Sequence, residues 1–475
     1  MFINIILDSI DISKNYPQTK GYAVKKYTGI ELMETAPVGP AIIRLALPMV
    51  AAMLAQAIYN MTDMFFIGQT GDPNMVAAVS LVFPLFMLSQ ALGNVFATGG
   101  SSYISRMLGA KKDTEARHTS AVSFYTTLGV GVILTAILWI FKTPVLRLIG
   151  ASDATFAYTD DYFSVTVLFM AVAAAGVVLS GQMRSEGATD KAMTLQLIGI
   201  ALNIILDPIL ILWCNMGTAG AAWATVAGQT ASLIYGILYY LGKKSILSIR
   251  FADYRPNNTM LFQVLSIGIP AGLGNLIMSV SNILGNRIAA SYGDFVVAGI
   301  GVQMRIASMV FMLVFALVQG YQPFAGFNYG AKNYDRLRKG FKIALLYATA
   351  VCVTGSFILR LFGNTFIRFF INDAKTIEAG TAIMYTFIWG LPFIGSQVTF
   401  MVSFQSFGKS GQAIVVTLGR QLLFYIPFLY LLNHIFGFKG FIWAQPAADM
   451  LTTGIAVLLS RPLFKIMQGE GVSPA

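Results

Sequence analysis

Runs of about twenty apolar residues recur along this chain of 475 residues, and no other feature constrains its fold as strongly. Each run is long enough to cross a hydrocarbon core of about 30 Å as a helix rising about 1.5 Å per residue. Only 11% of the residues are charged, against about 25% in a soluble domain. The sequence therefore predicts an all-α polytopic membrane protein with twelve transmembrane helices, at residues 42–68, 76–101, 119–141, 159–181, 192–213, 219–241, 263–290, 296–323, 341–362, 380–403, 413–433 and 440–464.

Basic residues gather in alternate loops between these runs. On one side they form three clusters, in residues 106–117, 243–255 and 332–342. Three loops on the other side, at residues 69–74, 215–218 and 291–294, carry none. Lysine and arginine accumulate in cytoplasmic loops, so both termini are expected in the cytoplasm and the chain in a bacterial-type inner (plasma) membrane. The net charge of +11 is explained by these basic loops at the surface of the lipid bilayer, so no nucleic-acid partner is expected.

The two halves of the chain resemble each other at an offset of about 220 residues. The matches include unusual residues: Pro48 with Pro270, Gly71 with Gly293, Gly109 with Gly330, and Trp223 with Trp443. Six spans per half place both halves in the membrane from the same side, so they are parallel repeats. We expect two pseudo-symmetric six-helix bundles around a central cleft. The expected organisation is a cytoplasmic tail (1–37), an N-lobe (38–242), a cytoplasmic linker (243–262), a C-lobe (263–466) and a C-terminal tail (467–475).

Two carboxylates interrupt apolar runs in the first half only. Asp63 aligns with Gly285, and Asp207 aligns with the apolar neighbourhood of Phe428. A carboxylate at membrane depth costs about 2.5–3.5 kcal/mol, and such residues commonly line the path of an ion, a proton or a substrate. The pair therefore indicates a functional site in the N-lobe.

Helix geometry places two further polar residues at this site. Asp63, Asp207 and Thr225 all fall about 8–9 Å below the outer boundary of their spans, and Asn203 lies one turn from Asp207. An oxygen-rich cluster of this kind suits Na⁺, and the same carboxylates could bind a proton instead. We therefore predict a cation-coupling site at Asp63, Asn203, Asp207 and Thr225. Thr225 could also serve only as an interhelical hydrogen-bonding group.

Other polar residues in the spans allow more than one interpretation. Gln56 and Asn60 continue a polar stripe on the helix of the first aspartate, where they could support the site or join helices. Asp449, in the last span, could face the cleft and bind cations or could pair with a neighbour. Arg184 and Glu186, at the inner end of the fourth span, are expected to form a local ion pair or gate.

The sequence argues against several other functions. Its cysteines (Cys214, Cys352) and histidines (His118, His434) are too few for a disulfide framework or a metal cage, and no phosphate-binding loop occurs. We therefore expect no cofactor and no enzymatic activity, with energy drawn from an ion gradient. An intramembrane enzyme and a sensor or channel that does not transport are the alternatives from other classes.

Four segments together resemble the multidrug and toxic compound extrusion transporters, on the branch of small-molecule efflux proteins from Gram-positive bacteria. They are residues 63–68 (DMFFIG), 102–111 (SYISRMLGAK), 202–210 (LNIILDPIL) and 220–225 (GAAWAT). The resemblance covers residues 37 to about 466. It implies a V-shaped pair of six-helix bundles, acting as a monomer, that exports drugs or organic cations in exchange for Na⁺ or H⁺.

The resemblance also bears on the site. In family members with an ion site in the N-lobe, the cation is held by residues at the positions that match Asp63, Asn203, Asp207 and Thr225. A glutamine of the family, seven residues before the first aspartate, matches Gln56. Another branch carries acids in the seventh and tenth spans; those positions lie near Met278 and near residues 396–397 here, which are not acidic. Coupling is therefore expected to depend on the first lobe. The alternative within transport is a flippase for lipid-linked oligosaccharides or polyisoprenoids, whose relatives share a doubled bundle.

Overall fold

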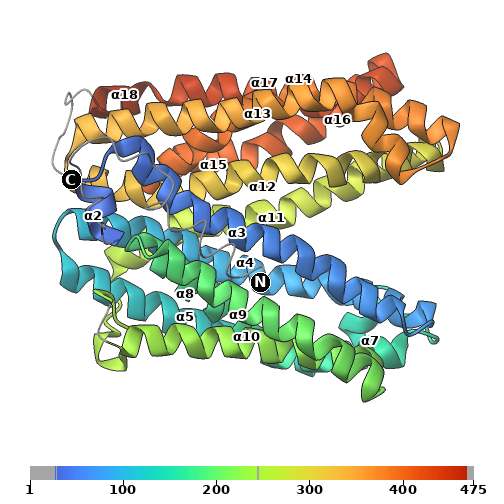
Figure 1. Cartoon of the computed structure of the whole chain (residues 1–475), viewed down its shortest axis with the longest axis horizontal. Helices are drawn as coiled ribbons and strands as arrows, with labels where there is room; N and C mark the ends of the chain where they lie inside the picture. Colours follow the sequence, from blue (N-terminus) through green and yellow to red (C-terminus); the bar gives the residue numbers. More distant parts are fainter. Residues whose placement is uncertain (1–26, 28, 243–244, 468–475) are drawn as a thin grey trace, which may run out of the picture.

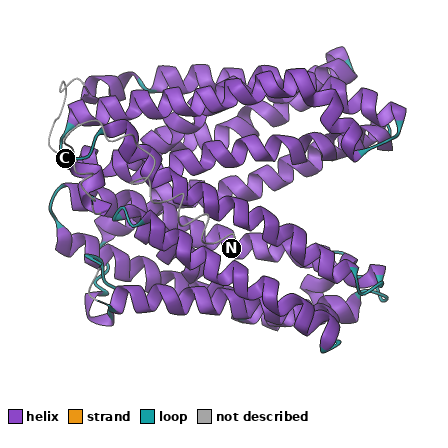
Figure 2. Cartoon of the chain, viewed as in Figure 1, coloured by secondary structure: helices purple, strands orange, loops and turns teal. Residues whose placement is uncertain are grey.

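The computed structural model describes residues 27, 29–242 and 245–467, which are almost entirely helical and include no strand (Figure 1, Figure 2). The N-lobe contains α3 (Val38–Gly68), α4 (Pro73–Gly109), α5 (Asp113–Ile140), α6 (Lys142–Leu148), α7 (Phe156–Leu168), α8 (Met170–Ser185), α9 (Thr189–Asp207), the π-helical segment η2 (Pro208–Trp213) and α10 (Gly217–Leu241). The C-lobe contains α11 (Asn258–Tyr292), α12 (Asp294–Gly330), α13 (Tyr334–Phe370), α14 (Ala374–Ser406), α15 (Ser410–Gly419), the π-helical segment η4 (Arg420–Tyr425), α16 (Ile426–Phe436), α17 (Phe438–Leu459) and α18 (Arg461–Met467). Two short helices lie outside the lobes, α2 (Gly29–Glu34) and η3 (Phe251–Asp253).

Each of the twelve expected runs falls on one helix or on consecutive helices. Ten helices in the described part are long and apolar enough to span a membrane, and α7 with α8, bent by 49°, pass the same test as a pair, so that eleven spans result if the pair crosses once. The remaining run is α10, whose 25 residues are rich in glycine and alanine. Its small residues allow close packing against α9, where a Cβ on Gly228 would lie 2.4 Å from the carbonyl oxygen of Gly199. The all-α polytopic prediction is confirmed.

The two repeats agree in local structure. Both α4 and α12 end at a glycine, Gly109 and Gly330, and the lysine two residues later has φ of 59° at Lys111 and 55° at Lys332. This left-handed residue lets the chain turn back and hydrogen-bond to the last turn of the helix. Both fifth-position spans also contain a π-helical segment, η2 and η4. The duplication therefore extends to the helix ends and to the distortions within helices.

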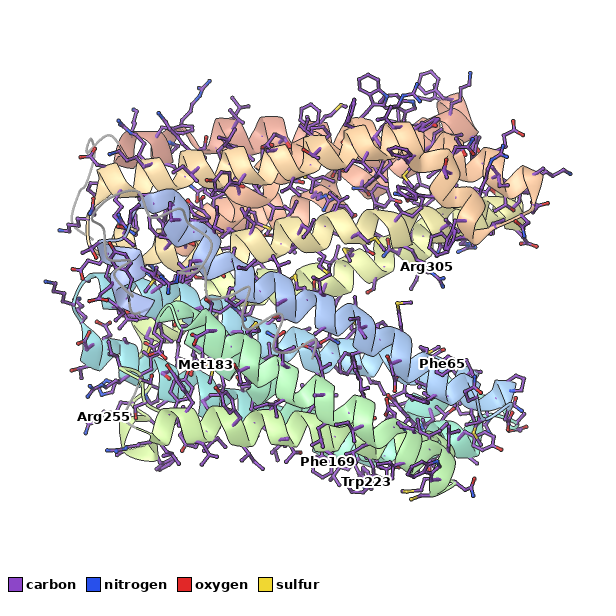
Figure 3. The ribbon with its side chains drawn as sticks, viewed as in Figure 1. Phe65, Phe169, Met183, Trp223, Arg255 and Arg305 are labelled. Atoms are coloured by element: carbon purple, nitrogen blue, oxygen red, sulfur yellow. The ribbon has the colours of Figure 1, made fainter. Side chains whose placement is uncertain are left out.

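The lobes meet at one end and diverge at the other, so the molecule is V-shaped (Figure 1). At the closed end, a Cβ atom on Gly109 would lie 1.9 Å from the carbonyl oxygen of Phe327. The matching Cβ on Gly330 would lie 2.0 Å from the carbonyl oxygen of Arg106. Only glycine allows two helix backbones to approach this closely. Arg255 lies toward this end, and Phe65 and Arg305 face each other across the open end (Figure 3).

Side chains also join the lobes at the closed end. Both terminal nitrogens of Arg106, from α4, donate to Oε1 of Gln263 in α11 at 3.2 Å. Ser102 of α4 donates to the carbonyl oxygen of Gln405 in α14. These hydrogen bonds couple the lobes where their backbones are in contact.

Two elements lie in segments that were expected to be connections. Helix α2 falls within the expected tail 1–37, yet its end is held by the C-lobe: Arg336 donates to the carbonyl oxygens of Met33 at 2.9 Å and Leu32 at 3.1 Å. At its start, Gly29 packs against Gly187 of the N-lobe. Helix α2 therefore bridges the lobes at the closed end. Helix α11 begins at Asn258, inside the expected linker 243–262.

The closed end should tolerate no added methyl group at Gly330. A Gly330→Ala substitution is expected to lower the thermal unfolding midpoint of the purified protein, because overpacking a tight contact costs about 1–3 kcal/mol. Gly301→Ala in the same helix is the control, since no atom lies within 4 Å of its Cβ position and alanine favours helices. Equal melting of the two variants would contradict the close contact between α4 and α12.

Candidate functional site

Three of the predicted site residues form a hydrogen-bonded cluster between α9 and α10. The amide nitrogen of Asn203 donates to Oδ1 of Asp207 and to Oγ1 of Thr225, both at 3.3 Å. Asp207 is the last residue of α9, and Pro208, which lacks an N–H, begins η2. The exposed fractions are 0% for Asp207, 2% for Asn203 and 7% for Thr225. The structure therefore buries this cluster where the α9 helix changes its hydrogen-bonding pattern.

Asp63 approaches the cluster from α3, which packs against α9. Its carboxylate is partly buried and interacts with that of Asp207. Tyr59, one turn before Asp63, and Tyr162 of α7 interact with both carboxylates and with the hydroxyl of Thr225. Four helices of the N-lobe thus converge on one polar site.

Three oxygens of this site have unused hydrogen-bonding capacity. Oδ1 of Asp63, Oδ1 of Asn203 and Oδ2 of Asp207 are buried and have no hydrogen-bond partner among the described residues. No described lysine or arginine forms an ion pair with either aspartate. Buried acceptors without donors are costly unless a cation or proton satisfies them. The donor set is all oxygen, which suits a hard cation such as Na⁺, and it suits a proton equally.

A polar pocket of about 270 Å³ extends from this cluster into the N-lobe. It follows α9 over successive turns, from Asn203 past Gly199 to Gln196, and reaches Arg184 at the end of α8. Gln319 of α12 is its only lining residue from the C-lobe among those described. The other polar lining residues are Gln56, Tyr59, Gln90, Asn94, Ser180, Thr225, Gln229 and Ser232.

The two supporting residues on α3 differ in position. Gln56 lines the pocket, whereas Asn60 is exposed and accepts a hydrogen bond from Nε2 of Gln56 at 3.2 Å. Of these two residues on α3, therefore, only Gln56 faces the pocket. Asn60 contacts the site only through its neighbour.

Asp449 does not belong to this site, and the cation-binding interpretation of it is wrong. It is completely buried in the C-lobe, where Oδ1 lies 2.7 Å from Nε of Arg420. Gln445 donates to the same oxygen at 3.1 Å. An arginine with a fixed positive charge already neutralises this carboxylate, so it has little need of a mobile cation.

At the position that matches the aspartate site, the described part of the C-lobe has different side chains and no unpaired carboxylate. A Cβ atom on Gly285, the counterpart of Asp63, would lie 2.9 Å from the hydroxyl of Tyr425. The tyrosine occupies the space that an acidic side chain would need. Gln445, the counterpart of Thr225, is hydrogen-bonded to Asp449. The repeated scaffold therefore carries an unpaired acidic site in one lobe and a neutralised one in the other.

Some residues of the site were missed or misjudged. Tyr59 could have been found, because it lies one turn from Asp63 on the same face. Tyr162 could not, because nothing in the sequence brings α7 toward α3. The expected ion pair of Arg184 and Glu186 is wrong: Glu186 accepts hydrogen bonds from Tyr239 and Ser245, each at 2.7 Å.

The family can now be established by comparison with known proteins. The family model MatE matches residues 48–209 and residues 270–431, once in each half. The chain belongs to the MatE family. As a member it is a multi-pass membrane transporter and not an enzyme.

Similar MatE proteins include curated export proteins and solved structures. The multidrug export protein MepA of Staphylococcus aureus is 29% identical over 426 residues, covering 90% of this chain and 94% of MepA. MepA of Staphylococcus haemolyticus is 28% identical over 429 residues, with the same coverage. A solved outward-facing multidrug resistance MATE transporter is 25% identical and superposes with a TM-score of 0.86, covering 94% of this chain and 100% of that one. A transporter from Pyrococcus furiosus, described as having a binding pocket of reversed polarity, has the same TM-score and identity and covers 94% of this chain and 99% of its own.

The Arg420–Asp449 pair should stabilise this MatE chain without taking part in transport. Replacing Arg420 by methionine leaves a buried carboxylate unpaired and is expected to destabilise the protein by about 3–5 kcal/mol. The double substitution Arg420→Met with Asp449→Asn should recover most of this loss, as measured by thermal unfolding in detergent. If both variants melt alike, the pair does not contribute as the geometry indicates.

Proposed function

We propose that this chain is a secondary-active multidrug exporter that exchanges organic, mostly cationic compounds for Na⁺ or H⁺. The observation that carries the proposal is the pair of aspartates, Asp63 and Asp207, held in the N-lobe without a basic partner. The names of the MepA relatives and of the outward-facing transporter support the export of drugs. The coupling cation is assigned to Asp63, Asn203, Asp207 and Thr225.

Helix α3 provides the connection between ion binding and lobe movement. Its first half packs against α12 of the other lobe, where a Cβ on Gly320 would lie 2.5 Å from the backbone nitrogen of Ala46. Its second half carries Asp63 and packs beside η2 and α10 through Ile67. A cation or proton that neutralises the two carboxylates would draw α3 toward α9, and the change would reach the lobe interface along the same helix. Such a ligand shifts the equilibrium by its difference in affinity for the two arrangements.

The direction of opening follows from the charge of the loops. The V opens at the end where residues 69–74, 215–218 and 291–294 carry no lysine or arginine, and the closed end carries the basic clusters. By the positive-inside rule, the chain lies in a plasma membrane in an outward-open state with its termini in the cytoplasm. Each N-lobe contains a full set of site residues, so a monomer suffices for the proposed cycle.

Removal of one carboxylate should abolish coupling. In vesicles containing the purified protein, ethidium transport driven by an imposed Na⁺ or pH gradient is expected to fall at least tenfold in Asp63→Asn, because losing one charged ligand costs more than about 1.4 kcal/mol. Asp207→Asn should behave alike.

The matched control is Asp153→Asn, in the same lobe, whose side chain is 93% exposed and distant from the site residues in sequence. It should transport as the unchanged protein does. Gradient-driven transport that persists in Asp63→Asn would refute the assignment of the coupling site. Comparing the two gradients identifies the ion.

A further inference from the structure

The inner end of the N-lobe pocket contains an arginine whose charge is not used by the proposed coupling site. Arg184 lies in the last turn of α8, close to Met183, which lies toward the closed end of the lobe (Figure 3). Its terminal nitrogen Nη1 donates to Oγ of Ser180 at 3.0 Å, one turn back toward the membrane interior. An arginine near a helix end can extend its charge into water, and this one instead points into the pocket.

No carboxylate neutralises Arg184 among the described residues. It forms no ion pair there, and the nearby Glu186 is fully engaged by Tyr239, Ser245 and the backbone N–H of Ile246. The two site aspartates are remote: along α9, Gln196 beside Arg184 is separated from Asp207 by eleven residues, or about 16 Å. Arg184 is half-buried and faces the pocket without a nearby anion, which favours negative charge at this end.

The groups around Arg184 are arranged as hydrogen-bond donors. Ser180 accepts from Arg184 and also from Nε2 of Gln196, at 3.2 Å, so its own proton is free to point into the pocket. A guanidinium has five N–H donors, and the described residues use one of them. Ser232 is turned away, donating to the carbonyl oxygen of Leu195 at 2.8 Å. The free donors of Arg184, Ser180 and Gln196 therefore converge on one space within the pocket.

We propose that this inner end is an anion-binding subsite built on Arg184, with Ser180 and Gln196 as supporting donors. The inner end of the pocket then carries a guanidinium, whereas Asn203 at its outer end donates to the carboxylate of Asp207 behind it. The group bound is a carboxylate or a small inorganic anion; the first comes from an amphoteric substrate, the second from solution. The inference concerns the same pocket as the proposed exporter function and deepens it, because it adds a requirement for negative charge to a site for cationic compounds.

The experiment uses two ligands that differ by one charge, an aminoacridine carboxylic acid and its methyl ester. Their binding to the detergent-solubilised full chain is followed by fluorescence, without any ion gradient. We expect Arg184→Gln to weaken binding of the acid relative to the ester by at least about tenfold, because a charged hydrogen-bonding partner is lost. Arg184→Lys should retain part of the preference, since it keeps the charge but not the planar fork. The ratio of the two affinities comes from one sample, so a fraction of unfolded protein does not affect it.

A second comparison distinguishes the source of the anion. If a free inorganic anion fills the subsite, the ester binds more tightly as chloride is raised at constant osmolarity with sucrose, and Arg184→Gln removes that dependence. The proposal is overturned if Arg184→Gln changes neither the acid-to-ester ratio nor the chloride dependence. The exporter proposal fails under a different result, namely if transport of the ester depends on neither the Na⁺ nor the pH gradient. That result does not change the ratio of the acid and ester affinities.

Discussion

The hydrocarbon core of a membrane supplies no hydrogen bonds, so polar groups placed there must find partners within the protein. This constraint explains why the described backbone is almost entirely helical. At the closed end, glycines let the helix backbones of the two lobes touch, and Arg106 and Ser102 add hydrogen bonds between the lobes. Arg420 and Asp449 obey the same rule by pairing with each other. Against that background, three charges are conspicuous because no described residue of opposite charge pairs with them: Asp63 and Asp207 in the aspartate cluster, and Arg184 at the inner end of the pocket.

The duplicated scaffold makes the asymmetry of charge informative. Both halves have glycines at the matching ends of α4 and α12 and a π-helical segment in the matching span, so their helices pack in similar ways. They differ where a carboxylate of the N-lobe is replaced by Gly285, whose neighbour Tyr425 fills the space. Packing alone would not require one lobe to keep unpaired acids, because the other lobe is built without them. The difference therefore supports a role in binding, and α3 places that role next to the contact with the C-lobe.

Much of the fold and part of the site could be predicted because the relevant information is local. Apolar runs of the length of a membrane span identify the helices, and the four-residue spacing of Asn203 and Asp207 places them on one face of α9. Other expectations failed for a common reason. Arg184 and Glu186 are two residues apart, yet the end of α8 directs them to different partners, Ser180 and Ser245. Asp449 could have faced the cleft or a neighbour, and only the position of Arg420, 29 residues earlier, decides between them.

The sequence by itself determined that this chain is a doubled bundle of membrane helices with the two site aspartates in its first half. Hydropathy, the repeat offset and the charge of the loops can all be read from the order of the residues, without knowledge of their contacts. Only the tertiary structure decided which charges neutralise one another. It separated Arg184 from Glu186, paired Arg420 with Asp449, brought Tyr162 to the aspartates, and placed Arg184 at the inner end of a pocket. Electrostatic interactions fall off over a few ångströms in a partly hydrated interior, so the function of a charge depends on neighbours that sequence distance does not specify.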